Sequence, residues 1–101
     1  MRFREALGEV IKEQRLAKEL SLRDVSRRGF VSYSFLNEVE RGEKECSSDY
    51  IEAIANGLGV STHSLIIEAG YRMSEWEVPD TPESLFVRSA DWIGQYSDLG
   101  N

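Results

Sequence analysis

The sequence predicts one all-α domain followed by an additional C-terminal helix, and three observations support that fold class. Apolar residues recur at three- and four-residue intervals, the period of an amphipathic helix, and no β-type alternation persists. Serines precede these apolar runs and glycines follow them, as helix caps do. The chain has 101 residues, 41% of them hydrophobic, which is enough for one core but excludes an enzyme with two substrate-binding domains.

The first helix is expected from Phe3 to Leu20, and the second is expected to be short. Ser21 provides a hydroxyl cap, and Asp24 stands three residues later in a capping-box position. This second helix runs to about Arg28, where Gly29 interrupts it. The apolar positions of the first helix are Phe3, Leu7, Val10, Ile11 and Leu20.

Three more short helices follow. The third is expected from Ser32 to Arg41, with an apolar stripe at Phe35, Leu36 and Val39. The fourth begins at Ser47 or Ser48 and continues through Leu58, and the fifth runs from Ser61 to Ala69. Each ends before a glycine, which suits a left-handed helix terminus: Gly42, Gly59 and Gly70.

The rest of the chain divides into a linker and one more helix. Residues 70–81 are acidic and lack a helical period, so residues 1–69 form the predicted domain and 70–81 a linker. Thr81, Pro82 and Glu83 form a strong helix start. The C-terminal helix, within residues 82–101, places Leu85, Phe86, Trp92, Ile93 and Tyr96 along one side.

The formal net charge of −6 is unevenly distributed along the chain. Residues 1–44 contain ten basic and eight acidic side chains, a net charge of +2. Residues 45–101 contain two basic and ten acidic ones, a net charge of −8. This asymmetry suggests that the first part faces a polyanion and the second faces something else.

Several functional classes find no support in the sequence. Cys46 and His63 are the only Cys and His, which excludes an internal disulfide and leaves too few ligands for a zinc site. No hydroxyl or thiol nucleophile has a base suggested by spacing, so we expect neither an enzyme nor a cofactor. No apolar run is long enough for a membrane span or a secretory leader, which predicts a cytoplasmic protein without membrane contact.

The second and third helices match the helix-turn-helix unit, whose second helix enters the major groove of DNA. Because the stripe at Phe35, Leu36 and Val39 faces the core, the opposite positions face outward. Three of these four outward side chains are neutral hydrogen-bonding groups suited to base edges. They are Tyr33, Ser34, Asn37 and Glu38.

Two segments of the chain resemble a known family. They are LSLRDVSRRGFVSYSFLNEVERG (residues 20–42) and CSSDYIEAIANGLGVSTHSL (residues 46–65). Residues 3–69 resemble the DNA-binding domain of lambda-type phage repressors and the Xre family of regulators. LRDVS, ERGEKE and the two serines before the fourth helix look most like the Clp gene regulators of actinobacteria, which activate Clp protease genes.

The resemblance implies roles for individual residues. Bases would be read by Ser32, Tyr33, Ser34, Asn37 and Glu38. DNA phosphates would be bound by Arg23, Arg27, Arg28, Arg41 and Lys44, although a basic pair such as Arg27 and Arg28 is also compatible with a solvated face. An arginine of the first helix usually pairs with the glutamate of ERG, which implies a structural Arg15–Glu40 ion pair.

The sequence also departs from the family pattern. Phe30 occupies the turn position that is commonly glycine, with Gly29 one residue earlier, so we expect a turn geometry rotated by one residue. Leu22 replaces the glutamine that commonly contacts phosphate, and Arg23 or Arg27 would replace that contact. Cys46 replaces a common proline and is interpreted as a small buried hydrophobic residue.

Function as a homodimer is expected, because one recognition helix contacts only about four or five base pairs and a two-fold dimer reads two half-sites. We expect dimerisation through the fifth helix, the linker and the last helix; packing of the last helix on its own domain is the alternative. The anchors would be Trp76, Leu85, Phe86, Trp92 and Ile93.

The sequence thus predicts a transcriptional regulator that binds an inverted repeat in double-stranded DNA. The resemblance to Clp gene regulators implies activation of protease and stress genes, with RNA polymerase and Clp protease as partners and control by proteolysis. The alternative is an antitoxin whose acidic C-terminal part binds a protein partner. A small enzyme or metal protein is a remote third possibility.

Overall fold

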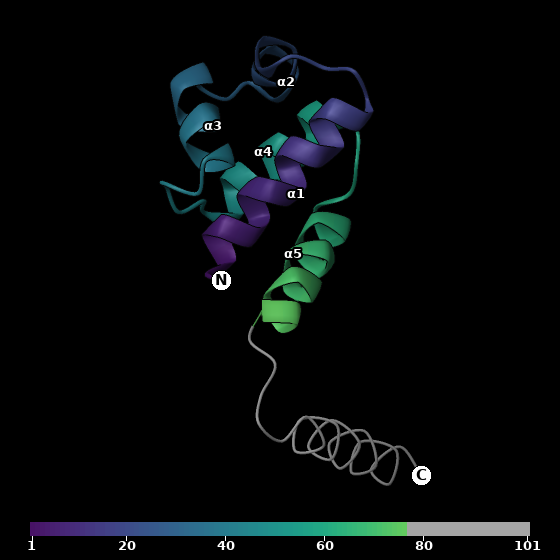
Figure 1. The fold of residues 1–101 in the computed structure, drawn as a ribbon. Helices are drawn as coiled ribbons and strands as arrows, with labels where there is room; N and C mark the ends of the chain where they lie inside the picture. The colour runs from purple at the N-terminus through teal and green to yellow at the C-terminus, as the bar shows by residue number, and fades with distance from the viewer. Residues whose placement is uncertain (77–101) are drawn as a thin grey trace, which may run out of the picture.

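The computed structural model describes residues 1–76, and these form five α-helices (Figure 1). No strand occurs among residues 1–76, so the all-α fold class that the sequence predicts is confirmed. No helix in this part of the chain is both long enough and apolar enough to cross a membrane. The helices are α1 (Phe3–Ala17), α2 (Leu22–Gly29), α3 (Tyr33–Glu40), α4 (Ser48–Leu58) and α5 (Thr62–Trp76).

Serine hydroxyls begin four of the helices, at the positions that the sequence predicts. Ser21 Oγ accepts the N–H of Asp24 at 3.0 Å, and the Asp24 carboxylate accepts the N–H of Ser21 at 2.8 Å, which completes a capping box. Ser32, Ser47 and Ser61 each accept the N–H three residues later, at 3.0 to 3.4 Å. Each cap spans only three residues, so local sequence is enough to specify it.

The core lies around α1, which packs against α5 and α3, while α2 packs against α4 (Figure 1). Aliphatic side chains from all five helices and from the α2–α3 turn meet there. Burial of this apolar surface is the main term that stabilises the fold. The buried residues are Ala6, Leu7, Val10, Ile11, Val25, Val31, Leu36, Val39, Ile51, Ile54, Ala55, Leu58, Leu65 and Ala69.

The first helix ends at Ala17, before the predicted end at Leu20. Glu19 adopts the left-handed conformation, with φ of 57°, and its N–H bonds to the carbonyl of Leu16. The N–H of Leu20 bonds to the carbonyl of Arg15, which completes a Schellman terminus without a glycine. Leu20 is half-buried and packs against the core, although it lies outside the helix. Its apolar character therefore made it look like the last helical residue in the sequence.

The turn between α2 and α3 keeps a glycine-type conformation on a residue that is not glycine. Phe30 has φ of 56°, and its side chain is 95% exposed. Gly29 is the last residue of α2, and a Cβ there would lie 2.4 Å from the carbonyl oxygen of Ala53 in α4. The expected rotation of the turn by one residue is therefore wrong: Gly29 serves helix packing, and the left-handed residue is Phe30.

Helix α5 continues to Trp76, so the predicted end at Ala69 and the start of the linker at residue 70 are wrong. Arg72 extends across to α1, where it bonds to both carboxylate oxygens of Glu13. These hydrogen bonds lower the pKa of the Glu13 carboxyl. Met73 packs against the core, so tertiary contacts continue the helix beyond the exposed Gly70.

The remaining part of the predicted linker, residues 77–81, lies outside the described residues. So does the predicted C-terminal helix at residues 82–101.

Candidate nucleic-acid interface

Helix α3 is anchored by one face and leaves its first turn open. Leu36 and Val39 are buried, and the hydroxyl of Ser26 in α2 donates to the carbonyl of Val31 just before the helix. Phe35 is half-buried and stacks on Tyr50 of α4, with ring centroids 4.5 Å apart. These contacts fix the orientation of α3 relative to α2 and α4.

The residues expected to read bases differ in exposure. Ser32, Tyr33 and Ser34 are exposed at the start of α3, where Ser32 is also the N-cap. Asn37 and Glu38, expected to face outward, are only half-exposed. The eight-residue helix packs on several neighbours, so its covered face is wider than the apolar stripe indicated. The first turn is therefore the most accessible part of the candidate reading surface.

Arg23 and Tyr33 link the two helices of the unit at the surface. The Arg23 guanidinium carbon lies 5.9 Å from the centre of the Tyr33 ring, within the range of a cation–π contact. Together with Ser26 and Arg27, these residues line an open hollow between α2 and α3. This contact orients the Tyr33 ring beside a positive charge.

The five residues expected to bind phosphate are all exposed: Arg23, Arg27, Arg28, Arg41 and Lys44. Arg27 pairs with Asp24 at 3.1 Å, and Arg41 pairs with Glu43 at 3.0 Å. Exposed pairs of this kind contribute little to stability, because water already screens the charges. Both guanidinium groups can therefore exchange their carboxylate for a phosphate at small cost.

The Arg15–Glu40 ion pair implied by the family resemblance is present and joins α1 to α3. Arg15 Nε donates to Glu40 Oε2 at 2.7 Å, and a second guanidinium nitrogen donates to Oε1 at 3.0 Å. A third nitrogen donates to the carbonyl of Leu20 at 3.0 Å. The hydrogen bonds to Glu40 raise the pKa of the Arg15 guanidinium. Both side chains are largely buried, so this pair positions α3 and is not available to DNA.

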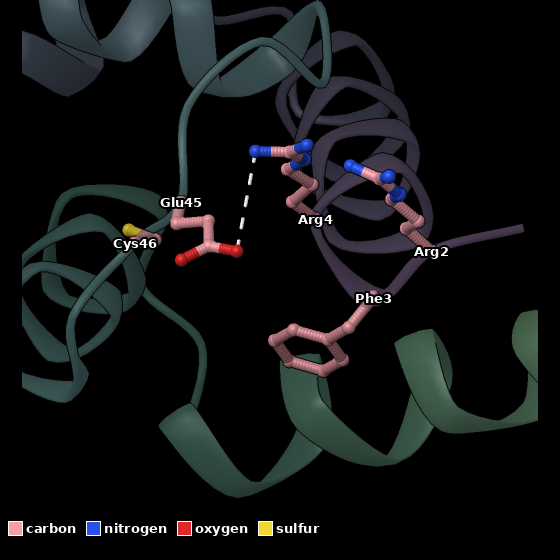
Figure 2. Close-up of a pocket in the computed structure, with 5 residues that line it drawn as sticks. All are labelled: Arg2, Phe3, Arg4, Glu45 and Cys46. Atoms are coloured by element: carbon pink, nitrogen blue, oxygen red, sulfur yellow. Dashed lines mark ion pairs between the residues drawn. The ribbon is translucent and has the colours of Figure 1, made fainter.

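A second hollow was not predicted from the sequence, and it lies between the first turn of α1 and the loop after α3. Figure 2 shows its lining, which consists of Arg2, Phe3, Arg4, Glu45 and Cys46. Burial raises the pKa of the Cys46 thiol to about 11, so this residue is an uncharged, half-buried thiol at neutral pH. The hollow joins segments forty residues apart, so no local motif could have indicated it.

The expected dimerisation anchors are largely outside the described residues. Trp76 is the last residue of α5, while Leu85, Phe86, Trp92 and Ile93 lie beyond residue 76. No cluster of metal-ligating side chains occurs within the part of the chain that the structure describes.

Residues 11–65 match the helix-turn-helix family model. The chain is 39% identical over 74 residues to the transcriptional regulator ClgR of Mycobacterium tuberculosis, an alignment that covers 73% of this chain and 66% of that relative. The chain thus spans slightly less than two thirds of the length of that curated relative.

Two solved structures illustrate the likeness in fold. The Clp gene regulator ClgR from C. glutamicum is 37% identical, with a TM-score of 0.68 over 72% of this chain and 95% of that chain. The restriction-modification controller protein C.AhdI from Aeromonas hydrophila is 27% identical, with a TM-score of 0.59 over 61% of this chain and 94% of that chain. The curated relative is a transcriptional regulator by name. The helix-turn-helix family model matches more than half of the chain. The chain therefore belongs to the helix-turn-helix family, as the sequence predicts.

Proposed function

We propose that this protein is a sequence-specific DNA-binding transcriptional regulator that uses α3 as its recognition helix. The observation that supports this best is the exposed first turn of α3, with exposed basic side chains on both sides of it in the sequence. Tyr33 and Ser34 offer hydrogen bonds to base edges, and Arg23, Arg27 and Arg41 offer charge to phosphates. Binding to DNA is the whole mechanism, and no bond is made or broken.

The likeness to ClgR supports a narrower role. The related protein from C. glutamicum is a clp gene regulator by name. We therefore propose that this protein activates Clp protease and stress genes in the cytoplasm, with RNA polymerase and Clp protease as partners and with its own level controlled by proteolysis.

A homodimer on an inverted repeat is the proposed active form, because a single α3 reads only about four or five base pairs. Helix α5 supports this proposal with an exposed apolar face that includes Ile66, Ile67 and Tyr71, which are 44%, 43% and 65% exposed. A second copy of the chain would cover this face. The anchors expected beyond residue 76 would extend the same interface.

Selection of bound fragments from random DNA tests the proposed function and reports the spacing of half-sites. We expect a palindromic site whose affinity falls steeply as salt rises, because phosphate contacts release counterions. Absence of duplex binding at low salt would reject the proposal.

Variants of the two groups of DNA residues should behave differently on that site. Tyr33→Ala and Asn37→Ala should relax sequence preference by about 1 to 3 kcal/mol at the bases that they contact. Arg27→Ala should weaken binding to the selected and the random duplex alike. It should also lower the slope of log K against log salt by about 1. If Tyr33→Ala and Asn37→Ala lowered the affinity for the selected and the random duplex equally, the assignment of these residues to base contacts would be contradicted.

The acidic second part of the chain, with a net charge of −8, keeps one other function open. An antitoxin would bind a basic protein partner through it, and purification from the native cell with a stoichiometric basic protein would favour that function.

A further inference from the structure

The first two turns of α1 approach the end of α3 and the loop after it closely, backbone against backbone. A Cβ at Gly8 would lie 2.4 Å from the carbonyl oxygen of Val39, and one at Gly42 would lie 3.3 Å from the Cα of Glu5. Gly42 also has φ of 75°, which favours glycine. The start of α1 is therefore held beside the loop that contains Arg41 and Lys44.

This packing gives the hollow of Figure 2 an excess of positive charge. Figure 2 shows the guanidinium groups of Arg2 and Arg4 directed away from the Phe3 ring, with Arg4 toward Glu45. Arg4 lies 3.9 Å from the Glu45 carboxylate, whose side chain is 85% exposed. Among the ion pairs of residues 1–76, none involves the Arg2 guanidinium.

The Arg4–Glu45 ion pair is too weak to explain, as a contribution to stability, why two arginines line this hollow. At 3.9 Å and with one partner exposed, the pair is screened by water and contributes little to stability. A phosphodiester offers two oxygens with the spacing of a guanidinium fork, and such bidentate contacts are stronger. Two more exposed basic residues, Lys44 and Arg41, stand one and four residues before Glu45 in the chain.

We propose that Arg2 and Arg4 bind a phosphate of the DNA backbone, beyond the phosphates contacted by Arg41 and Lys44, and that Glu45 is an internal counter-anion which this phosphate displaces. The inference rests on the proposed function and extends the contact surface to α1. Glu45 thereby lowers affinity for every sequence equally, because its carboxylate competes with the backbone phosphate.

The test uses the full chain with Arg2→Gln/Arg4→Gln, with Glu45→Gln, and with all three changes. Lys18→Gln and Glu19→Gln are matched controls, since these exposed residues stand at the opposite end of α1, about 21 Å from Arg4 at 1.5 Å per residue. Each protein is titrated with a duplex containing the selected site and with a random duplex at several salt concentrations. Circular dichroism and thermal unfolding establish that each variant is folded.

We expect Arg2→Gln/Arg4→Gln to lower the affinity for both duplexes by the same factor. The slope of log K against log salt should fall in magnitude by about 0.9 for each phosphate that the variant no longer binds. Glu45→Gln should raise the affinity for both duplexes several-fold. This gain should vanish in the triple variant, because Glu45 competes with phosphate only where the arginines are present. Lys18→Gln and Glu19→Gln should show much smaller changes of the same sign.

Two results would overturn the inference. One is a salt slope for Arg2→Gln/Arg4→Gln equal to that of Lys18→Gln, and the other is a Glu45→Gln gain that persists in the triple variant. If the unaltered chain binds neither duplex, the proposed function itself fails, so the two failures are distinguishable.

Discussion

At the scale of single residues, similar ion pairs differ in importance according to their burial. Glu40 lies on α3, yet its side chain is only 4% exposed and bonds twice to Arg15. Glu45 also faces an arginine, but its side chain is 85% exposed and the contact measures 3.9 Å. The first pair is part of the fold, whereas the second can be broken by a ligand.

Glu40→Gln should therefore destabilise the domain by about 3 kcal/mol or more, because the Arg15 charge would be left largely buried without its partner. Glu45→Gln should change the free energy of unfolding by less than about 1 kcal/mol. Urea unfolding followed by circular dichroism measures both. Similar losses for the two variants would show that burial does not distinguish these pairs.

Two glycines should respond in opposite directions to alanine. Gly29→Ala places a Cβ 2.4 Å from the carbonyl oxygen of Ala53, so α2 and α4 must separate, at a cost of about 1 to 3 kcal/mol. Gly70→Ala meets nothing within 4 Å in the exposed part of α5 and should stabilise that helix by up to about 1 kcal/mol. Thermal unfolding reports both changes, and a stabilising Gly29→Ala would contradict the tight packing of α2 on α4.

At the scale of elements, local sequence specifies where helices α2 to α5 begin, whereas their ends are of two kinds, with and without a glycine. All serine caps form within three residues, so their positions follow from the sequence. Gly42 and Gly59 adopt the left-handed termini expected of glycine, but Glu19 and Phe30 adopt the same conformation. In these two cases the next residue, Leu20 or Val31, packs in or against the core.

The cap of α2 makes its stability dependent on pH. The backbone N–H and then the hydroxyl of Ser21 lower the pKa of Asp24 by hydrogen bonding to its carboxylate. The Asp24 carboxylate therefore stabilises the fold above its unfolded pKa, and this contribution is lost as pH falls through the lower folded value.

Asp24→Asn should destabilise the domain near neutral pH, and the deficit should shrink in acid, because the wild-type carboxylate is then protonated too. Asp49→Asn is the matched control, because Asp49 is an exposed carboxylate in the first turn of α4. Urea titrations at both pH values measure the difference. A deficit that does not depend on pH would contradict the reciprocal capping box.

At the scale of the whole molecule, the net charge of −6 divides into a first part of +2 and a second part of −8. DNA would repel the acidic part, which favours the orientation that brings α3 to the groove. It would also limit non-specific affinity, so specific contacts and a second half-site must supply more of the binding. The proposed dimer would therefore contribute more to binding here than it would for a strongly basic domain.

Sedimentation of full-chain variants tests the dimer and separates its possible interfaces. Ile67→Lys/Tyr71→Lys should give a monomer if α5 forms the interface, and Phe86→Lys/Trp92→Lys should do so if the last segment does. Phe30→Lys changes an even more exposed apolar residue on the α2–α3 turn and should leave the dimer intact. A wild-type chain that sediments as a monomer at micromolar concentration would reject the proposed homodimer.

Sequence patterns alone predict the all-α fold, the starts of α2 to α5, most of the core and the helix-turn-helix unit. Their signals, a three-residue cap and a 3.6-residue apolar period, are local. Three other features became known from the folded structure: the length of α5, the half-burial of Asn37 and Glu38, and the hollow beside Arg2 and Arg4. Each of these depends on contacts between residues far apart in the chain, which local spacing does not encode.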